Sequence, residues 1–107
     1  MSDGGQDLDA QLAVIRDRFR GRLPGYRDRL QEAQKGFERG AGSVDVSSVK
    51  RLAHEIAGTA GTLGFTAIGR AAIAVETGAD SVLAGSALAD SLREPLERLI
   101  REIELEI

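Results

Sequence analysis

The sequence predicts an all-α fold, an antiparallel four-helix bundle with an additional N-terminal helix. Apolar residues recur at helical spacing along most of the 107-residue chain. No segment shows the alternating pattern of a strand, and the breaks between the helical stretches are short, as in helical bundles. The length suits one domain. We expect a flexible N-terminus over residues 1–6 and a single domain over residues 7–107.

The first third of the chain predicts two helical stretches. The first covers about residues 7–20 and carries one apolar stripe, made of Leu8, Leu12, Ile15 and Phe19. Gly21 and the Pro24-Gly25 pair interrupt this pattern. We therefore expect a second helix over about 26–37, with the first one packed across the bundle. The small residues at 40–43 then predict a loop.

Three further helices complete the predicted fold. One runs from about residue 46 to a break near Gly64, and the next covers about 66–77, with Gly78 as its stop. The buried face of this second helix is expected to consist of Ile68, Ala72, Val75 and Ala79. The last helix spans about 86–106, and Pro95 either kinks it or marks the start of its regular part. Its apolar stripe consists of Leu88, Leu92, Leu96, Leu99, Ile100 and Ile103.

Composition and charge argue against several classes of protein. The net charge is −3, with acidic and basic residues interleaved, so the chain lacks the basic balance of a nucleic-acid-binding protein. The absence of cysteine excludes disulfides and thiolate metal sites and is compatible with a reducing cytoplasm. The N-terminus does not resemble a signal peptide, and no apolar run approaches the ~20 residues of a membrane span. We therefore expect a cytoplasmic protein that binds neither nucleic acid nor membrane. We also expect it to be a monomer.

The only histidine, His54, is predicted to lie on the side of its helix opposite the core. At about 100° per residue, one apolar stripe forms from Val49, Leu52, Ala53, Ile56, Ala60 and Leu63. Gly58 and Gly61 fall on the exposed side with His54, and Lys50 and Arg51 lie one turn earlier. An interior helical glycine costs roughly 1 kcal/mol relative to alanine, but bare backbone beside an imidazole would let another protein approach closely. The plainer alternatives are an unreactive surface histidine and glycines that serve helix packing or a ragged helix end.

One exposed histidine supports few kinds of chemistry. A metal site needs further ligands, and the chain has no second histidine and no cysteine. No nucleophile and base occur at the spacing of a hydrolytic triad, and a convex helix face is a poor pocket for general acid–base catalysis. Nucleophilic attack by an imidazole nitrogen on a phosphoryl group remains, and Lys50 or Arg51 could stabilise the added negative charge. We expect no metal site and no resident cofactor.

Residues 54–64 (HEIAGTAGTLG) resemble the signature of histidine-containing phosphotransfer (HPt) domains. That signature is a histidine with a hydrophobic residue two positions on and glycines four and ten positions on, here Ile56, Gly58 and Gly64. The run from Ile68 to Glu76 is similar to the next helix of the family, which often ends in a Leu/Val-Glu pair. The resemblance covers about residues 19–107. It implies a phosphoryl carrier without kinase activity of its own.

The resemblance also implies the partners of this carrier. His54 would receive its phosphoryl group from the aspartate of a response-regulator receiver domain and pass it to the aspartate of another receiver. A hybrid histidine kinase is a further partner that the resemblance allows. The receiver domain would supply Mg²⁺. The chain has no glycine-rich phosphate loop, so we do not expect it to phosphorylate itself with ATP. The alternative function is a non-catalytic helical module that binds a signalling partner.

One position departs from the pattern of the family. The residue three positions after the histidine is commonly basic, but here it is Ala57. Arg51 could take over the role of that cation, or transfer could be slower. We expect the partner to contact Lys50, Arg51, Ala57, Gly58 and Gly61.

Overall fold

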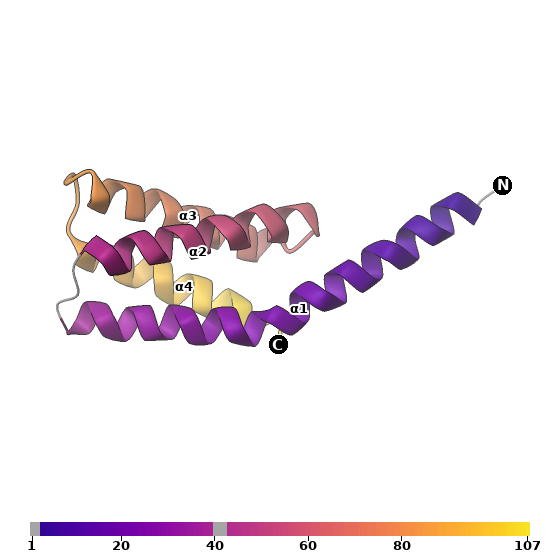
Figure 1. Ribbon diagram of the computed structural model, residues 1–107, viewed down its shortest axis with the longest axis horizontal. Helices are drawn as coiled ribbons and strands as arrows, with labels where there is room; N and C mark the ends of the chain where they lie inside the picture. Colours follow the sequence, from indigo (N-terminus) through magenta and orange to yellow (C-terminus); the bar gives the residue numbers. More distant parts are fainter. Residues whose placement is uncertain (1–2, 40–42) are drawn as a thin grey trace.

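The computed structural model describes residues 3–39 and 43–107, and all its regular elements are helical. The α-helices are α1 (Asp3–Glu38), α2 (Ser43–Thr62), α3 (Thr66–Leu83) and α4 (Arg93–Glu104), and a short 3₁₀ helix, η1 (Ala89–Leu92), precedes α4. Figure 1 shows the C-terminal half of α1 beside α2 and α4, with α3 on the far side of these two helices, while the N-terminal half of α1 projects away from the bundle. The all-α prediction is confirmed.

Apolar faces of the four helices meet in one core. The stripe predicted on α2 is buried throughout, and so is the predicted face of α3, formed by Ile68, Ala72, Val75 and Ala79. Complete burial of one leucine or isoleucine side chain contributes about 1.5–3 kcal/mol. This burial fixes the rotation of α2 about its own axis, so the opposite side of the helix faces solvent.

α1 differs from the prediction because it is one continuous helix of 36 residues with Pro24 inside it. An interior proline removes a backbone hydrogen bond and costs about 3 kcal/mol or more. Leu23, Tyr26 and Leu30, on either side of Pro24, are buried, and their burial offsets that cost. The prediction of a separate N-terminal helix packed across the bundle was therefore wrong, because residues 7–18 are exposed and belong to the projecting half of α1.

Two predicted segments lie partly outside the described residues. Residues 1–2 of the expected flexible terminus are not among them, and α1 already begins at Asp3. Residues 40–42 of the expected loop are not among them either, and α2 begins at Ser43.

The same backbone motif ends α2 and α3. Gly64 has a φ of 87°, and the N–H of Phe65 donates to the carbonyl of Ala60 at 2.9 Å. Gly85 has a φ of 81°, and the N–H of Ser86 donates to the carbonyl of Ser81 at 2.9 Å. These are Schellman caps, which favour glycine because a side chain strains a positive φ. The predicted break near Gly64 is confirmed.

Gly78 was wrongly predicted to end α3. It lies within the helix, where an added Cβ would come within 3.0 Å of the Cδ2 atom of Leu92. Its small size therefore serves close packing between α3 and η1.

The C-terminal region follows the second of the two readings of Pro95. α4 begins at Arg93, so the proline occupies the first turn of the helix, where no N–H bond is lost. Leu92, Leu96, Leu99, Ile100 and Ile103 are buried as expected. Leu88 is not part of the stripe, since it precedes η1 and is 81% exposed.

Candidate functional site

His54 lies within α2 on the side that faces solvent. Its side chain is 77% exposed, while Ala53 and Ile56 on the same helix are completely buried. The predicted orientation of the histidine is therefore confirmed. An imidazole that stands on a rigid helix and faces solvent is accessible to a second protein.

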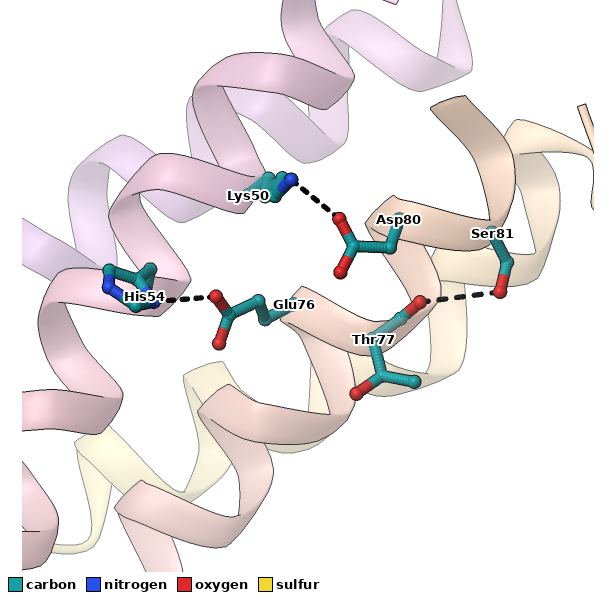
Figure 2. Close-up of polar contacts among 6 residues, drawn as sticks. All are labelled: Lys50, His54, Glu76, Thr77, Asp80 and Ser81. Atoms are coloured by element: carbon teal, nitrogen blue, oxygen red, sulfur yellow. Dashed lines mark hydrogen bonds and ion pairs between the residues drawn. The ribbon is translucent and has the colours of Figure 1, made fainter. Parts of the chain in front are cut away.

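Two polar contacts join α2 to α3 on this side of the bundle (Figure 2). The Nδ1 atom of His54 lies 2.6 Å from the Oε2 atom of Glu76, and the Nζ atom of Lys50 lies 2.6 Å from the Oδ1 atom of Asp80. Lys50 and His54 are four residues apart on α2, as are Glu76 and Asp80 on α3. Residues at this spacing share a helix face. The short turn at Gly64 makes the two helices antiparallel, so the pairs lie opposite each other.

The contact with Glu76 determines how the imidazole is presented. A neutral imidazole has one protonated nitrogen and one with a free lone pair. A carboxylate only accepts hydrogen bonds, so the 2.6 Å contact is made by Nδ1–H donating to Glu76. This tautomer leaves the lone pair on Nε2. The nitrogen with the free lone pair is therefore the one that does not contact Glu76 of α3.

The charge of Lys50 is engaged within the protein. The pKa of Lys50 is raised above its ordinary value, chiefly by the side-chain hydrogen bond to Asp80 and then by attraction to that carboxylate. Arg51 is exposed and makes no hydrogen bond or ion pair with any other described residue. Of the two basic residues expected beside His54, Arg51 is thus the one available to an external group.

The predicted site residues fall into three environments. A shallow groove brings Lys50, Arg51 and His54 together, and its further lining residues are Ser47, Glu76 and Leu83. Ala57 is half-buried and packs against the core. Gly58 and Gly61 are exposed, and a Cβ added at either would meet nothing within 4 Å. The expected open backbone beside the histidine is present, and whether a partner uses it stays a prediction.

Sequence reasoning missed the contacts of Glu76 and Asp80. Glu76 was noted only as part of a family pattern, and Asp80 was not considered. The signal was available, since both acidic residues fall outside the buried face of α3 at the same four-residue spacing as Lys50 and His54. What the sequence lacked was the register between the helices, which the turn at Gly64 determines.

The described part of the chain holds no group of three or more histidine, cysteine, aspartate or glutamate side chains placed to bind a metal ion. Among the same residues, no helix combines the length and the apolar character needed to cross a membrane.

Comparison with known families places this geometry in context. The model of the Hpt domain family matches residues 14–102. No curated protein and no solved structure matches the chain. The family match covers most of the bundle, including the whole of α2 and α3, and leaves out residues 3–13 of α1 and the last two residues of α4. The chain therefore belongs to the histidine-containing phosphotransfer (Hpt) domain family.

Proposed function

We propose that this domain carries a phosphoryl group on the Nε2 atom of His54, between aspartates of response-regulator receiver domains. Membership in the Hpt family supports phosphotransfer in general. The observation that carries the assignment to one atom is the 2.6 Å contact between Nδ1 of His54 and Glu76, which leaves Nε2 as the free nucleophile.

In the proposed step, the lone pair of Nε2 attacks the phosphorus of an aspartyl phosphate on the receiver. The P–N bond forms as the P–O bond to the aspartate breaks, and the aspartate leaves as a carboxylate. The proton on Nδ1 stays in place, so the ring becomes an imidazolium, whose positive charge Glu76 stabilises. The reverse step returns the phosphoryl group to another receiver. The receiver supplies Mg²⁺, and the chain acts as a carrier without kinase activity.

Because residue 57 is alanine and not a basic residue, another cation must balance the charge of the phosphoryl group. Phosphorylation of histidine adds negative charge beside the helix surface, which a cation stabilises. Lys50 is engaged by Asp80, so we assign this role to Arg51, which lines the same groove as His54. Gly58 and Gly61 would let the receiver approach the backbone of α2.

The test is incubation with a phosphorylated receiver domain and Mg²⁺, followed by intact mass measurement. We expect the gain of one phosphoryl group that is lost in acid, and ³¹P NMR should place it on Nε2. The His54→Gln variant, which keeps a polar side chain of similar size, is the control and should gain nothing. Stable complex formation without phosphorylation would instead identify the non-catalytic interaction module.

A further inference from the structure

The projecting segment of α1, residues 7–18, has no counterpart to pack against in a single chain. Every side chain in it is exposed, and the buried part of the helix begins directly after it, at Phe19. The Hpt family match begins at Val14, so residues 7–13 of this segment lie outside it.

The projecting segment nevertheless carries an apolar stripe. Leu8, Leu12 and Ile15 are separated by four and three residues, which is the spacing of the contact positions in a coiled coil. They are 55%, 41% and 46% exposed. The stripe continues into Phe19, which is buried in the core and packs its ring against that of Phe65. Beyond the bundle, the same stripe is uncovered.

A helix of this length needs support that the bundle does not provide. Isolated helices shorter than about 12–15 residues are marginal in water, and helices in proteins are stabilised mainly by packing of an apolar face. Where α1 leaves the bundle, the Nε atom of Arg16 donates to the carbonyl of Leu63 at 2.8 Å. This bond anchors the base of the segment, but its stripe still requires a second apolar surface.

The charges along α1 indicate what that surface is. Within the projecting segment, Asp7 and Asp9 lie toward the tip, while Arg16 and Arg18 lie toward the bundle, with Asp17 between them. In an antiparallel pair of identical helices, each acidic tip would lie beside the basic base of its partner. A parallel pair would place like charges together, and an acidic tip is unsuited to an anionic membrane surface.

We propose that the projecting segment is a dimerisation element and that two copies of this chain pair antiparallel through Leu8, Leu12 and Ile15. The groove at His54 contains none of these residues, so it stays open in both copies. The expectation of a monomer, made from the sequence, is replaced by a dimer with the two bundles at opposite ends of the paired helices.

Sedimentation equilibrium of the full chain tests the assembly. The wild type should approach twice the monomer mass of 11.4 kDa as concentration rises. Leu12→Lys should shift the chain to monomer, because symmetry places the charge in the interface twice. Leu88→Lys is the matched control, since Leu88 is an exposed leucine outside the stripe, and this variant should still dimerise. Circular dichroism would verify that both variants are folded. A wild type that stays monomeric, or a dimer that survives Leu12→Lys, would overturn the proposal.

A second experiment tests the orientation. The chain has no cysteine, so a single spin label can be introduced at Gln11→Cys or Arg18→Cys. In an antiparallel pair, the distance between the two labels at position 18 should exceed that at position 11 by at least about 10 Å, given the 1.5 Å rise per helical residue. Similar distances at both positions would contradict antiparallel pairing.

Discussion

Glu76 contacts the ring nitrogen that is not proposed to react, and this arrangement predicts a graded effect of substitution. Glu76→Ala removes both the orientation of the ring and the nearby negative charge. Since a hydrogen bond at a partly exposed site is worth about 0.5–1.5 kcal/mol, phosphotransfer should slow by about three- to tenfold. Glu76→Gln retains an acceptor for Nδ1–H and should slow it less. Transfer rates from a phosphorylated receiver would measure both, with Glu97→Ala as the control, because Glu97 is an exposed glutamate of α4 outside the groove. Equal rates in Glu76→Ala and the wild type would exclude this role.

Arg51 is expected to compensate for the missing cation at Ala57. Arg51→Ala should reduce the rate or extent of His54 phosphorylation several-fold at low salt, and the effect should shrink at high salt because exposed charges are screened. Adding Ala57→Lys should recover the rate, since the stem of a lysine can pass from a half-buried position to solvent. The single and double variants are compared in rapid-quench transfer assays. If Arg51→Ala transfers normally at low salt, the charge is stabilised by the receiver alone.

Two substitutions at Gly58 distinguish an effect on stability from an effect on the approach of the partner. A Cβ at this position meets nothing within 4 Å, so Gly58→Ala should raise the free energy of unfolding by several tenths to about 1 kcal/mol. Gly58→Gln should keep the fold but slow transfer, because its side chain would stand between the helix and the receiver. Urea unfolding and transfer rates on the same samples distinguish the two effects. Wild-type transfer by Gly58→Gln would remove the reason given for an open backbone.

At the scale of the helices, Gly85 provides a better test of the Schellman caps than Gly64 does. Its φ is 81° and an added Cβ meets nothing within 4 Å, so Gly85→Ala introduces backbone strain without a clash. We expect a loss of about 1–2 kcal/mol in the free energy of unfolding, measured by urea titration. Gly58→Ala, with the same chemical change in an ordinary helical conformation, should have the opposite sign. A neutral Gly85→Ala would mean that the end of α3 relaxes freely.

The periodicity of the sequence predicted helix faces better than helix ends. Helical spacing identified the buried side of α2, and with it the exposure of His54, because burial of one stripe dominates the energy of a packed helix. It failed at Pro24, whose cost is offset by tertiary packing of residues around it. It also failed at Gly78, since a glycine that ends a helix and one that accommodates a neighbour look the same in sequence.

The contact between His54 and Glu76 depends on neither a helix face nor a helix end, but on the alignment of two helices. The spacing of acidic and basic residues is visible in the sequence, but which acid meets the imidazole depends on how α2 and α3 are aligned. Periodicity within a single helix therefore predicted the reactive residue, His54, but could not predict its partner, Glu76.

At the scale of the whole molecule, α1 is divided into a packed half and an exposed half at Phe19. The ring of Phe19 lies 5.2 Å from that of Phe65 and 6.1 Å from that of Tyr26, measured between centroids. Phe19→Ala should therefore cost about 3–5 kcal/mol, a large share of the ~5–15 kcal/mol typical of a domain. Leu88→Ala should change the free energy of unfolding by less than about 0.5 kcal/mol. Chemical denaturation compares them, and a small effect of Phe19→Ala would contradict its place in the core.

The turn at residues 63–65 has a consequence for how this chain can change during evolution. Surface loops usually accept inserted residues at little cost. Here one extra residue would rotate the faces of α3 by about 100° relative to α2, and Glu76 would no longer lie opposite His54. Natural selection on the function of His54 should therefore also constrain this turn, which lies about three helical turns away along the chain. Descendants that keep the proposed activity should conserve the length of this turn together with its glycine, Gly64.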